Sequence, residues 1–84
     1  MKAEIIKPEV AAKELREMGM RINAQNIRYG LREGKFPFGV AINMGKQWEY
    51  LIYRKLFDEF KELVSNYQTF VISQIQYINN YIAF

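Results

Sequence analysis

The chain of 84 residues contains no cysteine and no histidine, and each absence excludes a class of chemistry. Without cysteine there is no disulfide framework, no zinc knuckle and no thiol nucleophile. Without histidine the commonest general base and metal ligand is missing as well. Because no residue set resembles a nucleophile with its base, we expect that the chain is not an enzyme and binds neither a metal nor another cofactor.

Other shortages narrow the class of protein further. The N-terminus lacks the basic region and the apolar run of a secretory signal, so we expect a cytoplasmic protein. The chain has no low-complexity tract and no flexible linker, and its length suits one domain. With 50% hydrophobic and 25% charged residues, the composition is that of an ordinary globular protein rather than a disordered one.

Charge is distributed unevenly along the chain. Residues 16 to 55 carry eight basic side chains against three acidic ones, whereas no charged residue follows Glu62. A compact basic segment is typical of proteins with a polyanionic partner, most often a nucleic acid. The alternative is that a small domain is mildly basic without functional consequence.

The first half of the chain predicts two short helices. Pro8 suits a first helical position and Gly19 a C-terminal stop, with Ala11, Leu15 and Met18 on the buried side. Asn23 is a favoured N-cap for a second helix that ends at Gly34. The inward face of that helix comprises Ala24, Ile27 and Leu31. The tight link between the two makes a helix-turn-helix candidate.

In the second half of the chain the spacing of apolar residues changes from that of a helix to that of a strand. Pro37 ends any helix, and Phe38, Val40 and Ile42 alternate as in a strand. A Gly-containing turn at residues 43–46 and the run 48–53 complete a β-hairpin, at the position of a wing. A third helix is predicted from Arg54, with apolar residues spaced three and four apart. Those residues are Leu56, Phe57, Phe60, Leu63 and Val64.

The second helix carries the residues best suited to read DNA. Arginine can pair with guanine, glutamine with adenine, and tyrosine with a phosphate or a thymine methyl group. The candidate contacts on this helix are Gln25, Asn26, Arg28, Tyr29 and Arg32. The alternative is a solvated helix face, on which arginine and glutamine are common.

The hairpin and its flank add a second set of candidate contacts. A turn tip with polar and basic side chains can lie along a phosphate backbone or enter the minor groove. The candidates are Lys35, Asn43, Lys46 and Gln47. The alternative is a plain surface turn. Trp48, Tyr50 and Ile52 are expected to pack the hairpin on the helices rather than to stack on bases.

Three segments together resemble a known family. They are residues 8–15, residues 25–39, with Gly-Lys-Phe-Pro-Phe-Gly at their end, and residues 48–53. They resemble the excisionase-like and MerR-like winged-helix proteins of phages and mobile elements in Gram-positive bacteria. The likeness covers residues 5 to 63, but the segment from Arg16 to Ala24 is longer than the family's turn.

The resemblance implies a fold and a function. The expected fold is mainly α with a β-hairpin (α+β): a winged helix-turn-helix over residues 1–64 with an added C-terminal helix. The expected function is sequence-specific binding of double-stranded DNA, as a recombination directionality factor acting beside an integrase or as a transcription regulator. The alternative is a protein-interaction module in which Tyr29, Trp48 and the tail form a docking surface.

The tail, residues 65–84, is apolar and uncharged. A helix is favoured over a strand, and it would carry an aliphatic stripe beside an aromatic one. The residues proposed for oligomerisation are Phe70, Val71, Ile75, Ile78, Tyr81 and Ile82. Packing back on the domain is the alternative. The six Asn and Gln side chains argue against a membrane span.

Overall fold

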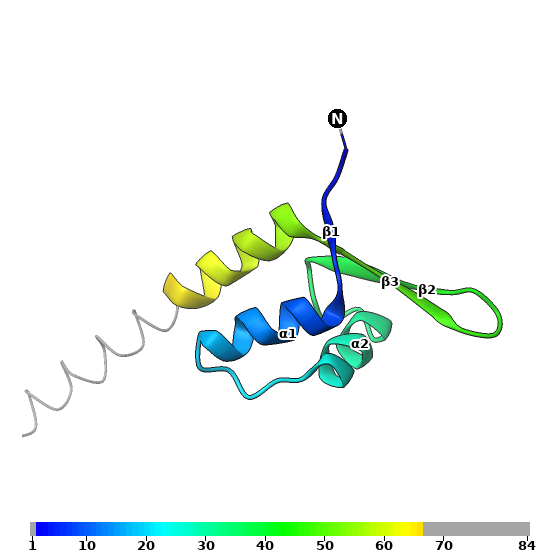
Figure 1. Ribbon diagram of the computed structural model, residues 1–84, viewed down its shortest axis with the longest axis horizontal. Helices are drawn as coiled ribbons and strands as arrows, with labels where there is room; N and C mark the ends of the chain where they lie inside the picture. The colour runs from blue at the N-terminus through cyan, green and yellow to red at the C-terminus, as the bar shows by residue number, and fades with distance from the viewer. Residues whose placement is uncertain (1, 67–84) are drawn as a thin grey trace, which may run out of the picture.

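The computed structural model describes residues 2–66, which form a small α+β domain. The elements are β1 (Ile5–Ile6), α1 (Pro8–Glu17), α2 (Ala24–Arg32), β2 (Gly39–Asn43) and β3 (Trp48–Tyr53), followed by a third helix described over residues 54–66. Within this part of the chain the strands form one antiparallel sheet in the order β1-β3-β2. The helices α1 and α2 lie together below the sheet, and the third helix continues from the end of β3 (Figure 1).

The predicted start and end of the first helix, α1, are both confirmed. Pro8 occupies the first turn of α1, and Lys7 before it makes no side-chain cap. After the helix, Gly19 has a φ of +91°, a conformation that glycine adopts without a steric penalty. The N–H groups of Gly19 and Met20 donate to the carbonyls of Arg16 and Leu15 at 2.9 and 3.1 Å. This pattern is the Schellman motif, which satisfies the last carbonyls of the helix.

The second helix begins and ends by similar devices. Asn23 is the N-cap, and its Oδ1 accepts a hydrogen bond from the backbone N–H of Asn26 at 2.8 Å. At the C-terminus Gly34 has a φ of +66°, and the Lys35 N–H donates to the Gly30 carbonyl at 2.8 Å. Local capping chemistry therefore determines both ends of α2, which is why the sequence located them.

The hairpin is present, and its first strand begins and ends one residue later than predicted. β2 begins at Gly39, and Val40 and Ile42 point to the side of the sheet opposite the core. The alternation of Phe38, Val40 and Ile42 therefore does not mark an inward face, since Phe38 lies in the loop before the strand. The packing predicted for β3 is confirmed for Tyr50 and Ile52, whereas Trp48 is exposed to 38% and does not pack against the core.

The strand β1 was not predicted. Its two residues pair with the far end of β3, where Ile5 lies opposite Tyr53 and Ile6 opposite Ile52. Two residues are too few for a period to be visible in the sequence. The pairing also joins segments almost fifty positions apart, which no local pattern reports.

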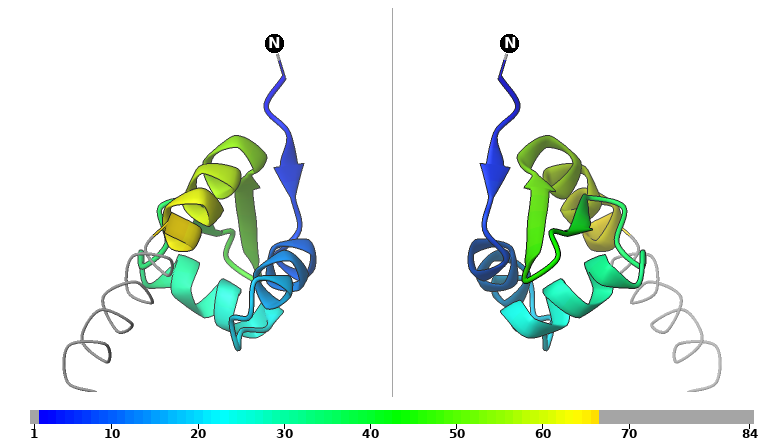
Figure 2. Two further views of the ribbon diagram at one scale, coloured as in Figure 1. Left: turned by 90° about the vertical axis from the view of Figure 1, so that its left-hand side faces the viewer. Right: turned by 90° about the vertical axis from the view of Figure 1, so that its right-hand side faces the viewer.

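The core lies between the sheet and the helices. Its largest fully buried side chains are Phe38, Phe57, Leu15, Ile27 and Ile52. The Phe38 ring stacks on Phe36 with centroids 4.8 Å apart and meets Phe57 and Phe60 edge-on at 5.0 Å each. The end-on views show the third helix beside the strands and α1 and α2 below them (Figure 2). This cluster fixes the hairpin to the third helix.

The third helix differs from the prediction in one respect. Phe57 is buried and Phe60 packs against the core, but Leu56 and Leu63 are exposed, Leu63 to 68%. Spacing alone does not separate them, because a helix at the edge of a small domain buries only part of its apolar face. The six residues proposed for oligomerisation, from Phe70 to Ile82, lie outside the described residues. Within residues 2–66 no helix is long and apolar enough to cross a membrane.

Candidate nucleic-acid interface

Four of the five predicted contacts on α2 are exposed, and Arg28 is half-buried. The exposed residues are Gln25, Asn26, Tyr29 and Arg32, with Tyr29 exposed to 59%. Ile27, Gly30 and Leu31 on the other side are buried, and this packing fixes the rotation of the helix about its axis. The residues predicted to read DNA from α2 thus share one accessible face with a large aromatic side chain at its centre.

Asn26 also has a structural role that the sequence analysis missed. Its Oδ1 accepts a hydrogen bond from the backbone N–H of Asn23 at 3.0 Å, so the two asparagines form a reciprocal capping box. The usual signal for that motif is glutamate or glutamine at this position, and asparagine is a shorter side chain for the same task. With one hydrogen bond already accepted by its carbonyl oxygen, Asn26 keeps its two amide donors and one lone pair for a partner.

Arg28 is held by three neighbours. Its Nη2 donates to the Glu9 carboxylate in the first turn of α1, and its Nη1 to Gln25 Oε1 at 3.4 Å. The guanidinium also lies 5.9 Å from the centroid of the Tyr50 ring, a cation–π distance. The Glu9 carboxylate accepts hydrogen bonds from the backbone N–H of Glu9 and from the Arg28 side chain. Both hold the pKa of Glu9 below its usual value. Arg28 therefore joins α1, α2 and β3.

Arg32 contacts the hairpin through one aromatic ring, and unlike Arg28 it forms no ion pair among the described residues. Its guanidinium lies 5.9 Å from the centroid of the Trp48 ring, on the first residue of β3. No acidic partner is paired with Arg32 among the described residues. Its charge is consequently available at the surface, while the stacking holds the side chain near the hairpin.

The hairpin tip brings the other predicted contacts together. Asn43 is the last residue of β2, and its Oδ1 accepts a hydrogen bond from the Gly45 N–H at 2.9 Å. Gly45 has a φ of +98°, and the Met44 N–H donates to the Gln47 carbonyl at 2.8 Å. Lys46 and Gln47 are exposed on this ordered turn, which projects beyond the helices (Figure 1). Lys35 is exposed in the loop between α2 and β2 and lies apart from the tip in sequence.

The ionic network of the domain lies elsewhere, between α1 and the third helix. Arg54 donates two hydrogen bonds to the Glu14 carboxylate, each 2.8 Å long, and Lys61 Nζ lies 2.6 Å from Glu14 Oε1. Hydrogen bonds from Arg54 and Lys61 lower the pKa of Glu14 to about 2. The same contacts with Glu14 raise the pKa of both Arg54 and Lys61. These three residues hold helices together, and the sequence offered no local signal for their long-range pairing.

Comparison with known proteins yields no matching family model, no matching curated protein and no matching solved structure. Among residues 2–66 no cluster of acidic side chains is arranged to hold a metal ion.

Proposed function

We propose that this chain is a winged helix-turn-helix protein that binds double-stranded DNA in a sequence-specific manner. In this proposal α2 lies in the major groove, and the hairpin of β2 and β3 is the wing that follows the phosphate backbone. The observation that carries it is the accessible face of Gln25, Tyr29 and Arg32, held against the hairpin by the Arg32–Trp48 contact. Side chains of these types match the donors and acceptors of base edges and phosphates.

The electrostatics of the two elements support the same proposal. The exposed face of α2 carries no carboxylate before Glu33, and the hairpin tip carries Lys46 without an acidic neighbour in the turn. Phosphate contacts from such cations supply most of the non-specific affinity for DNA. An excisionase-like factor acting beside an integrase and a transcription regulator both require this contact, so the proposal covers both roles.

Arg28 has a positioning role in the proposed complex. Its hydrogen bond to Gln25 orients that side chain, and its ion pair with Glu9 fixes α1 to α2. Replacing Arg28 therefore disturbs the fold as well as the interface, which makes Arg32 the better residue for a test.

The test is a competition gel shift with fragments from the protein's own genomic locus. We expect one fragment to outcompete bulk DNA, and Arg32→Ala to weaken that binding by about 1–3 kcal/mol with the circular dichroism spectrum unchanged. Lys2→Ala is the matched control, because it removes one exposed positive charge from the N-terminal arm, away from α2 and the hairpin tip. The proposal is wrong if no fragment outcompetes bulk DNA, or if both variants bind as the unmodified chain does.

A further inference from the structure

Among the described residues 2–66, no helix packs on one face of the sheet. Positions that pair directly across antiparallel strands point to the same side, and the pairs Val40–Leu51 and Ile5–Tyr53 point away from the core. Ile42 is on this side as well. We call these five residues, Ile5, Val40, Ile42, Leu51 and Tyr53, the outer sheet face. Val40 and Ile42 are exposed to 45% and 41%.

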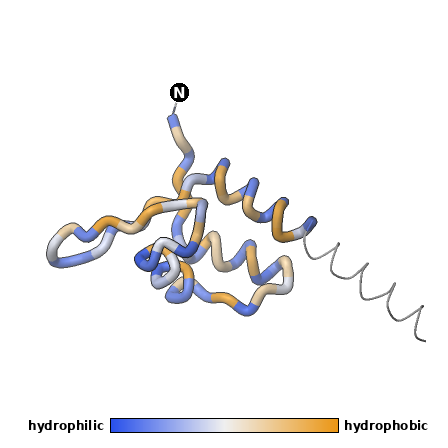
Figure 3. Tube along the Cα trace, turned by 180° about the vertical axis from the view of Figure 1, so that it is seen from behind, coloured by the Kyte–Doolittle hydropathy of each residue, from blue (hydrophilic) through white to orange (hydrophobic). Residues whose placement is uncertain are grey.

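The opposite face of the same hairpin is covered by α2. The rings of Tyr50 and Trp48 lie under the guanidinium groups of Arg28 and Arg32, each at 5.9 Å. An antiparallel sheet with one solvated face normally carries polar residues there, so five apolar residues across three strands are unusual. Hydrophobic positions occur in both strands of the hairpin, interspersed with hydrophilic ones (Figure 3). Contiguous apolar patches of this kind mark sites of association.

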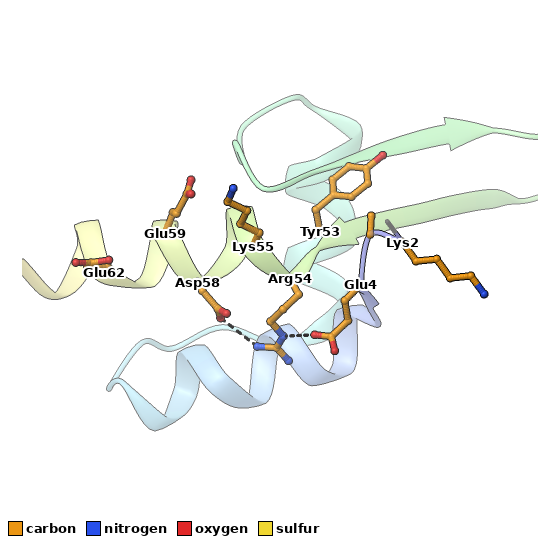
Figure 4. A pocket seen from close by; sticks show the side chains of 9 residues that line it. Lys2, Glu4, Tyr53, Arg54, Lys55, Asp58, Glu59 and Glu62 are labelled. Carbon is orange, nitrogen blue, oxygen red and sulfur yellow. Dashed lines mark hydrogen bonds and ion pairs between the residues drawn. The ribbon is translucent and has the colours of Figure 1, made fainter.

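The charges at the two ends of the outer sheet face indicate which partner fits. The residues of β3 on this face are Glu49, Leu51 and Tyr53. Lys55 follows in the first turn of the third helix, so an acid lies at one end of the strand and a base just beyond the other. Tyr53 and Lys55 point to the same side of the chain, opposite Arg54 and Asp58 (Figure 4). Neither Glu49 nor Lys55 has an ion-pair partner among the described residues.

We propose that the outer sheet face is the docking surface for a second copy of this chain. Two copies related by a two-fold axis run their β3 strands antiparallel, so Glu49 of each lies opposite Lys55 of the other, and the apolar residues stack between them. Packed sheets are about 10 Å apart, a separation that glutamate and lysine side chains can bridge. The pattern is self-complementary, as an isologous interface requires. The association does not depend on DNA binding.

Five residues on each side are few beside the roughly 20–30 of a standard interface, so we expect association in the micromolar range. Sedimentation equilibrium of the full chain should show the mass rising from one chain to two across that range. The double variant Val40→Lys with Ile42→Lys should raise the dissociation constant by at least about tenfold, because it places four positive charges in the apolar contact. Val10→Lys is the control, since Val10 is also exposed, to 38%, but lies on α1.

Charge reversal provides a second arm that does not touch apolar residues. Glu49→Lys alone and Lys55→Glu alone should each weaken the association, and the two together should restore it. A chain that stays monomeric at high micromolar concentration would overturn the proposal. So would a dimer whose mass is unchanged by the double lysine variant, since its interface then lies elsewhere, as in the tail. Failure of the combined charge reversal to restore association would exclude the antiparallel arrangement and the proposal with it.

Discussion

At the scale of single residues, half-buried charges connect segments that lie far apart in the sequence. Glu14 accepts from Arg54 and from Lys61, and Arg54 also reaches Glu4 and Asp58 at 3.2 Å each. The Glu14 carboxylate therefore links α1 to the third helix. The Arg54 guanidinium also links the third helix to the N-terminal segment through Glu4. Bidentate arginine–carboxylate pairs of this kind are stronger than single exposed ion pairs.

Glu14→Gln should lower the free energy of unfolding by about 1–2 kcal/mol at neutral pH, because Arg54 and Lys61 lose their charged acceptor. Urea denaturation at pH 7 measures the loss. Glu17→Gln is the matched control, since Glu17 lies on the same helix, is exposed and makes no ion pair among the described contacts. Equal urea midpoints for Glu14→Gln and Glu17→Gln would show that the ion pairs of Glu14 contribute nothing to the free energy of unfolding.

The same carboxylate gives this contribution a definite pH dependence. The folded-state pKa of Glu14 is about 2, below its ordinary value of 4.5, so the stabilisation is fully present above pH 4.5. It is lost as the pH falls from there towards 2. The stability difference between the unmodified chain and Glu14→Gln should therefore narrow over that interval. A difference that stayed constant down to pH 2 would contradict the assignment.

At the scale of helices and strands, the sequence predicted what local chemistry controls. The ends of α1 and α2 follow from Pro8, Asn23, Gly19 and Gly34, and each acts within a few residues of itself. What it could not predict depends on contacts between distant segments: the strand β1, the pairing of Arg28 with Glu9, and the outward direction of Val40. The face of α2 was predicted well because helical periodicity separates its buried and exposed residues.

Gly30 in α2 shows how such contacts reverse a local rule. Replacing a helical glycine with alanine ordinarily stabilises a protein by about 0.5–1 kcal/mol. Here the added methyl group would overlap the Phe36 ring, which stacks on Phe38. We expect Gly30→Ala to destabilise the domain by roughly 1–2 kcal/mol, measured by thermal or urea denaturation, because overpacking outweighs the helix preference.

The control for Gly30→Ala is the same substitution in a Phe36→Leu background. The smaller, flexible side chain leaves room for the methyl group, so the penalty should shrink or disappear. A Gly30→Ala variant that is more stable than the unmodified chain would mean that Phe36 does not pack against α2 as described.

At the scale of the whole molecule, the sheet separates two surfaces of different chemistry. The face of α2 and the hairpin tip are polar and basic, and the outer sheet face is apolar and directed the other way. In the two-fold dimer proposed above, the two α2 faces point in opposite directions. Each dimer then presents two separate DNA-binding surfaces, which suits the joining of two duplexes better than adjacent half-sites on one.

The most direct measurement of the central proposal is the salt dependence of DNA affinity, followed by fluorescence anisotropy on the fragment that wins the competition. With about four to six phosphate contacts, log K should fall against log salt with a slope of roughly −4 to −5. Lys46→Ala should make that slope less negative by about one, whereas Lys2→Ala should leave it unchanged. A slope near zero, or one that Lys46→Ala does not alter, would contradict the account of α2 and the hairpin as a DNA-binding surface.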